Sequence, residues 1–180
     1  MRLIAKLKTF AASTGLYICY LLGACILTML VEAMLVFFID HIVLLSYPVL
    51  TIIRIVIYSL GVPAIIGVLG YYEGYREAEC SLGETAGSFF LALIVHILFA
   101  MLFKFQGFIS GAVRFTAGFI HNQWNITQQT LVENTPYSLF LIVFLAYSIL
   151  YFAVLFLCKY FGSRKRICDR AELRRNETED

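Results

Sequence analysis

The chain has 180 residues, of which 61% are hydrophobic and only 14% are charged, and its formal net charge is +2. Ordinary globular chains are about 45–50% apolar and about 25% charged. A soluble domain of this size cannot hide so much apolar surface, and the basic residues gather at the two ends of the chain rather than in one patch. The composition therefore excludes a nucleic-acid-binding domain and predicts an all-α, polytopic integral membrane protein whose main partner is the lipid bilayer.

The N-terminal segment 1–15 carries Arg2, Lys6 and Lys8 and no acidic residue, which predicts a basic cytoplasmic N-terminus. A secretory signal peptide also begins with positive charge, but its apolar region is only about 7–15 residues long. Here the apolar run continues from 16 to 39, which is about 36 Å of helix and enough to cross a hydrocarbon core of about 30 Å. We therefore expect an uncleaved first span.

A second span is predicted at 47–70, because a short turn separates it from the first and Pro48 suits a first helical turn. Pro63 lies inside this span, and a proline within lipid needs neighbouring helices to satisfy the freed backbone groups. This helix should therefore pack inside a bundle. Gly67, Gly70 and Gly74 give it a smooth face near its end, with the GxxxG spacing of close helix contacts.

Residues 71–86 are predicted to form a polar loop. Four glutamates outnumber the single Arg76 in this segment: Glu73, Glu77, Glu79 and Glu84. Two interpretations remain open, a solvated loop or a site for a cation or a partner.

A short third span is predicted at 87–103, with His96 at its middle. The segment 105–121 follows, in which Gly107, Gly111, Arg114 and Gly118 recur at spacings of three and four and so share one helical face. It is predicted to be an amphipathic interfacial helix, a re-entrant helix or a continuation of the third span. A fifth crossing is the remaining alternative.

The fourth span is predicted at 137–161, followed by a charged cytoplasmic tail at 162–180 that should form a short helix and then fray. Arg164, Lys165 and Arg166 lie next to the membrane. Each would favour anionic lipid headgroups by about 1 kcal/mol near the surface.

The distribution of basic residues decides between four and five spans. With four spans, eleven basic residues lie on the side that holds both chain ends, counting Lys159 with the tail, whereas only Lys104 and Arg114 lie opposite. This bias predicts that both termini are cytoplasmic. The expected location is a bacterial cell membrane, although the bias does not distinguish bacterial from eukaryotic membranes.

Two charged residues fall inside the first two spans. Glu32 lies seven residues before Ile39, and Arg54 lies seven residues after Tyr47, so both are roughly 10 Å below the outer boundary. Equal depth on adjacent antiparallel helices predicts an ion pair that holds the helices together. The alternative is a polar site for a solute or proton, to which His96 would contribute.

No HExxH, GxSxG, P-loop or GxGxxG motif is present, so we expect no enzymatic activity, no cofactor and no metal. The five cysteines lack metal-ligand spacing, and no disulfide is expected. The sequence favours a non-enzymatic binding, accessory or assembly component of a membrane complex, with a membrane-protein partner or a second copy. The alternative is an oligomeric transporter or channel subunit for a small solute or ion, in which Glu32, Arg54, His96 and Arg114 line a polar path.

Overall fold

The structure, a computed structural model, describes residues 2–42, 47–77, 81–102, 116–117, 120 and 136–179. Within these ranges the regular structure is entirely helical, as the sequence predicted. Four long helices make up the fold: α1 (Arg2–Ile42), α2 (Tyr47–Arg76), α3 (Leu82–Leu102) and α6 (Tyr137–Glu179).

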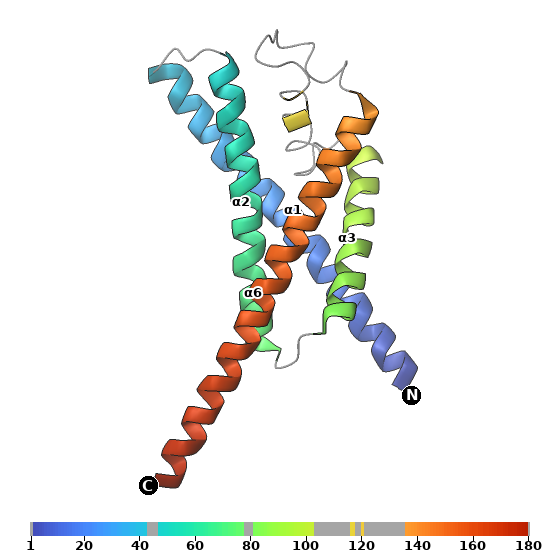
Figure 1. Cartoon of the computed structure of the whole chain (residues 1–180), viewed down its shortest axis with the longest axis vertical. Helices are drawn as coiled ribbons and strands as arrows, with labels where there is room; N and C mark the ends of the chain where they lie inside the picture. Colours follow the sequence, from blue (N-terminus) through green and yellow to red (C-terminus); the bar gives the residue numbers. More distant parts are fainter. Residues whose placement is uncertain are drawn as a thin grey trace.

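The helices alternate in direction, so that both termini lie at the same end of the bundle (Figure 1). We call this the terminal end. The most extensive contact joins α2 and α6, which run side by side in the same direction; α1 packs against both α3 and α2. Contact between α3 and α6 is slight, and the backbones of α2 and α3 do not approach closely within the described residues. The helices therefore follow the spatial order α3, α1, α2, α6.

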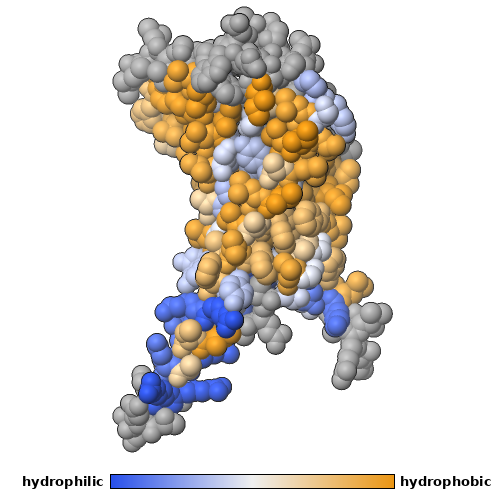
Figure 2. Space-filling view, viewed as in Figure 1, coloured by the Kyte–Doolittle hydropathy of each residue, from blue (hydrophilic) through white to orange (hydrophobic). Residues whose placement is uncertain are grey.

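Three of these helices contain segments long and apolar enough to cross a membrane: Lys6–Ile39, Val49–Arg76 and Tyr137–Arg175. In α3 the described apolar segment, Leu82–Leu98, is shorter. Figure 2 shows hydrophobic surface over the middle of the helices and hydrophilic residues at the terminal end. These features are consistent with an integral membrane location.

The core is narrow compared with the apolar surface around it. Its buried side chains come from all four helices and include Tyr17, Leu21, Ile66, Phe89 and Tyr151. Large apolar side chains such as Met34 and Ile142 are more than 60% exposed. A protein surface that is apolar along most of its length is suited to lipid, since water would oppose its exposure.

Glycines allow α2 and α6 to approach closely. A Cβ atom at Gly70 would lie 2.9 Å from the carbonyl oxygen of Leu155, and one at Gly74 would overlap the carbonyl group of Lys159. From the other helix, a Cβ at Gly162 would overlap the carbonyl group of Tyr71. The small residues of 67–74 therefore form a true helix contact, which the GxxxG spacing alone could only suggest.

Two predictions about helix ends are wrong. The polar loop expected at 71–86 is much shorter, because α2 continues to Arg76 and α3 begins at Leu82. The short, fraying helix expected in the tail at 162–180 is instead an unbroken continuation of α6, which extends to Glu179. In both places the chain remains helical where it becomes polar, since a helix needs no apolar environment once neighbouring turns hold it.

The predicted interfacial or re-entrant segment lies almost entirely outside the described residues. Of its 105–121 range, only Thr116, Ala117 and Ile120 are described. The positions of Gly107, Gly111, Arg114 and Gly118 are not among them, so their shared face stays a prediction.

Candidate functional site: two charge clusters and a polar cavity

A buried lysine forms the centre of a charge cluster near the terminal end. Lys159 of α6 lies 2.5 Å from Oε1 of Glu73 on α2 and 3.0 Å from Oε2 of Glu77, the residue that directly follows α2. Its ammonium group also donates a hydrogen bond of 3.1 Å to the hydroxyl of Tyr17 on α1. The Tyr17 hydroxyl donates in turn to Glu73 Oε1 at 2.9 Å. We call Tyr17, Glu73, Glu77 and Lys159 the lysine cluster; it joins three helices.

The glycine contact between α2 and α6 positions this cluster. Gly74 lies against the backbone of Lys159, and Glu73 is its immediate neighbour in α2. Close backbone approach at Gly74 therefore brings the carboxylate and the ammonium group together. From α1, Tyr17 is 1% exposed and its ring packs edge-on against Phe89 of α3. Through Phe89, α3 therefore packs against the Tyr17 ring and helps to hold it in the cluster.

Burial makes these contacts energetically important. The side chains of Lys159 and Glu73 are only 6% and 3% exposed. Taking either charge out of water alone would cost several kcal/mol, which the opposite charge and hydrogen bonds must offset. An ammonium group has three N–H donors, and three oxygen atoms lie within 3.1 Å of Lys159 Nζ. The lysine is therefore fully engaged by its own chain.

A polar cavity of about 400 Å³ opens beside the lysine cluster. Charged and hydroxyl side chains dominate its wall: Tyr17, Glu77, Ser81, Glu84, Thr85 and Lys159, with two further hydroxyl side chains of α1. These residues come from α1, α6, the end of α2 and the start of α3. The cavity therefore lies where four chain segments converge at the terminal end of the bundle.

A second charge cluster joins α1 and α2 nearer the opposite end. Arg54 Nε lies 3.0 Å from Glu32 Oε1, and the Tyr58 hydroxyl donates a 2.9 Å hydrogen bond to Glu32 Oε2. Both oxygens of the Glu32 carboxylate are therefore engaged. The side chains of Arg54 and Glu32 are 23% and 17% exposed, so this pair is less buried than the lysine cluster.

His96 is buried on α3, at 2% exposure, and does not lie at the level of the Glu32–Arg54 pair. Contact between the rings of Tyr17 and Phe89 aligns α1 with α3, which run in the same direction (Figure 1). Counting from this contact, His96 is seven residues along α3 and Glu32 is fifteen residues along α1. The difference of eight residues corresponds to about 12 Å. The three predicted polar residues therefore do not converge on one site.

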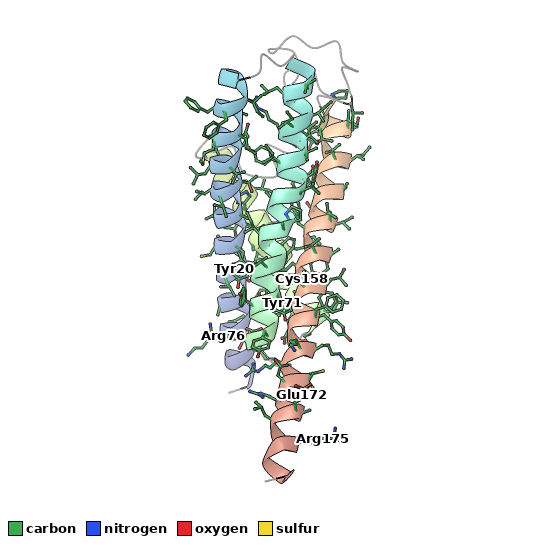
Figure 3. All side chains as sticks on the ribbon, turned by 90° about the vertical axis from the view of Figure 1, so that its left-hand side faces the viewer. Tyr20, Tyr71, Arg76, Cys158, Glu172 and Arg175 are labelled. Carbon is green, nitrogen blue, oxygen red and sulfur yellow. The ribbon has the colours of Figure 1, made fainter. Side chains whose placement is uncertain are left out.

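Beyond the apolar part of α6, polar contacts hold the helical extension to the end of α2. Asp169 accepts a 3.0 Å hydrogen bond from the Tyr75 hydroxyl and lies 3.0 Å from the ammonium nitrogen of Lys165. Glu172 and Arg175 lie farther along, where α6 projects past the other helices (Figure 3). Arg164 and Arg166, two of the predicted lipid contacts, begin this extension.

The lysine cluster is the feature that sequence reasoning missed. Glu73 belongs to the segment predicted to be a polar loop, whereas the structure places it on α2 with its side chain buried against Lys159. A signal was nevertheless present in the sequence. Glu73 lies 26 residues after Tyr47 and Lys159 lies 22 residues after Tyr137, a difference of about 6 Å in depth on two helices that start at the same end. The depth count applied to Glu32 and Arg54 would have found them.

The arrangement can hold helices together and can present carboxylate and hydroxyl groups to a small polar ligand. Among the described residues, no group of three histidine, cysteine or acidic side chains is placed to hold a metal ion. None of the described cysteines, Cys19, Cys25, Cys158 and Cys168, forms a disulfide with another described residue. A second hollow, of about 550 Å³, lies on the surface between α2 and α6 near Tyr71 and Cys158, which Figure 3 labels, and its wall is mainly apolar.

Comparison with known proteins adds no family to this description. No family model, curated protein or solved structure matches the chain.

Proposed function

We propose that this chain is a four-span integral membrane protein with both termini in the cytoplasm, and that it serves as a non-enzymatic binding or assembly component of a membrane complex. The spans are the apolar parts of α1, α2, α3 and α6. Two features support this topology: both termini lie at one end of the bundle (Figure 1), and the basic residues of the sequence concentrate there.

One observation carries the assembly role. The buried Lys159 and the partly buried Glu32 are engaged in contacts between helices of this chain: Lys159 with three oxygen atoms, and Glu32 with Arg54 and Tyr58. Charges that link helices stabilise one arrangement of the bundle, whereas a transport cycle requires such links to break and re-form. A fixed bundle with an apolar exterior is suited to packing against another membrane protein.

Mild-detergent purification tests the assembly role. The tagged full-length chain is expressed in its source cells and purified in a gentle detergent, and its complex is sized by native mass spectrometry. We expect a second membrane protein or a second copy to co-purify in fixed ratio. A chain that is always monomeric and alone, also after crosslinking in intact membranes, would contradict the proposal.

The polar cavity at the terminal end favours one alternative, an oligomeric subunit of a transporter or channel for a small solute or ion. Its wall reaches inward to the buried Tyr17 and Lys159. The measurement that separates the two functions is solute or proton flux into vesicles containing the purified chain. Flux that requires Glu32, Arg54 or His96 would favour transport. Vesicles that contain the chain and show no flux of solute or protons would favour assembly.

A further inference from the structure

Some polar groups on the wall of the cavity at the terminal end are not engaged in contacts between helices. Lys159 is on its wall, but three oxygen atoms of Tyr17, Glu73 and Glu77 already surround its ammonium group. No N–H donor of this lysine is left for an incoming anion. The remaining polar groups on the wall are carboxylates and hydroxyls, so the cavity offers hydrogen-bond acceptors without a free cationic group.

The charge balance of the cavity is negative. Glu77 and Glu84 lie on the wall and Glu73 lies directly behind it, whereas Lys159 supplies the single positive charge of this group. Two negative charges are therefore not neutralised within the cluster. A concave site at the edge of a low-dielectric bundle concentrates this field and attracts a cation.

A hydroxyl group that faces the cavity provides a second, independent observation. Thr85 is 3% exposed and lines the cavity. Its hydroxyl makes no hydrogen bond with any residue in the part of the chain that the structure describes; only its backbone N–H does, to the carbonyl oxygen of Ser81. Its oxygen is open to the cavity rather than enclosed, so water or a ligand in the cavity can be its hydrogen-bond partner.

Size and ligand geometry restrict the class of cation. An ammonium group can be bound by one or two carboxylates and a hydroxyl, which are the acceptors that Glu77, Glu84 and Thr85 offer. A volume of about 400 Å³ is at the lower end of the range for small-molecule sites. We propose that the cavity between Glu77, Glu84 and Thr85 binds a small organic cation through a primary ammonium group.

Glu84 also has a local structural role that the experiment must separate from binding. Ser81 and Glu84 have the spacing of a capping box at the start of α3, and glutamine serves this motif as well as glutamate. The substitution E84Q therefore keeps the cap and removes the charge. T85V keeps the shape of Thr85 and removes its hydroxyl. E172Q makes the matched change on the projecting part of α6, away from the cavity (Figure 3).

The binding experiment uses the full-length protein in detergent and isothermal titration calorimetry with propylammonium chloride, sodium acetate and sodium chloride at equal ionic strength. For the wild type, we expect saturable one-site binding of propylammonium and no saturable binding of acetate or sodium. Propylammonium should bind at least tenfold more weakly to E84Q and severalfold more weakly to T85V. Its binding to E172Q should be unchanged.

Absence of saturable propylammonium binding, equal binding in E84Q and wild type, or sodium binding as tight as propylammonium binding would each overturn the proposal. If E84Q does not fold, T85V alone decides the outcome: unchanged binding in T85V overturns the site. The assembly role is tested by co-purification without any ligand, so failure of one proposal is distinguishable from failure of the other.

Discussion

At the scale of single residues, the described charges inside this bundle serve as links between helices. Lys159 and Glu73 are almost wholly buried, and Glu32 has a partner on each of its carboxylate oxygens. An isolated charge in this environment would be expensive, so each charge constrains where its partner helix lies. The same physics makes each link vulnerable to loss of one partner.

Replacing Lys159 by methionine should be the most damaging single charge substitution in the lysine cluster. K159M would leave the buried Glu73 carboxylate without its cation, a change that costs about 3–5 kcal/mol when a buried pair is broken. The measurement is the free energy of unfolding in mixed micelles titrated with a denaturing detergent. K165M is the matched control, because that lysine side chain is 59% exposed, and it should change stability by less than about 1 kcal/mol. Equal stability of K159M and wild type would refute a structural role for the cluster.

The Glu32–Arg54 pair should contribute less than the lysine cluster, because it is more exposed and Tyr58 still serves Glu32 when Arg54 is lost. We expect R54L to lower the free energy of unfolding by about 2 kcal/mol, the scale of a hydrogen bond to a charged group. The double substitution E32Q/R54L should recover part of this loss, since it removes the unpaired charge. An R54L variant as stable as wild type would mean that the pair is not structural, and would favour the solute-site interpretation.

At the scale of elements, the pairing of α2 with α6 depends on backbone approach rather than on interlocking side chains. Gly70 and Gly74 place α2 directly against the backbone of Leu155 and Lys159. The GxxxG spacing was visible in the sequence, but which helix it meets was not, because small residues on one helix do not specify the partner. The tertiary structure decides this through Gly162 of α6, which lies against the backbone of Tyr71.

Substituting Gly74 by alanine should force α2 and α6 apart, because the added methyl group would overlap the backbone carbonyl of Lys159. Overpacking of this kind typically costs about 1–3 kcal/mol, and it should also loosen the lysine cluster next to it. G15A is the control within a helix, since nothing lies within 4 Å of a Cβ atom at Gly15. That change should be neutral or stabilise the helix by up to about 1 kcal/mol.

The free energy of unfolding of both variants gives the comparison. A G74A variant that unfolds with the same free energy as G15A would show that the close contact is not needed. A large loss in G74A with no loss in G15A would support it.

At the scale of the whole molecule, the described residues form four long helices, with both ends of the chain on one side (Figure 1). The described part of α3 contacts α1 and, slightly, α6, and it carries His96 at a level different from the Glu32–Arg54 pair. A proton relay between His96 and Glu32 would have to make up a difference of eight residues of helix, or about 12 Å measured along the helices. This separation weakens the transport path that the sequence suggested.

The proposed topology makes a direct prediction for labelling in intact cells. Single cysteines introduced at Thr9 and at Leu173, in a background without native cysteines, should both be protected from a membrane-impermeant thiol reagent applied outside, because both positions lie at the proposed cytoplasmic end. A cysteine introduced at His41, at the other end of α1, should react. Opposite labelling of the two terminal positions would require an odd number of spans and contradict the four-span proposal.

The sequence by itself determined the helical class and the apolar exterior, because these follow from local composition and from the length needed to cross a bilayer. Counting residues from the turn before Tyr47 also placed Glu32 and Arg54 at the same depth, because two adjacent antiparallel helices bring residues equally far from their shared turn to the same level. Only the tertiary structure decided that Glu73 and Lys159 are buried together, that α2 pairs with α6, and that a polar cavity forms beside them. These features depend on which helices become neighbours, and contacts between residues 86 positions apart are set by packing rather than by local pattern.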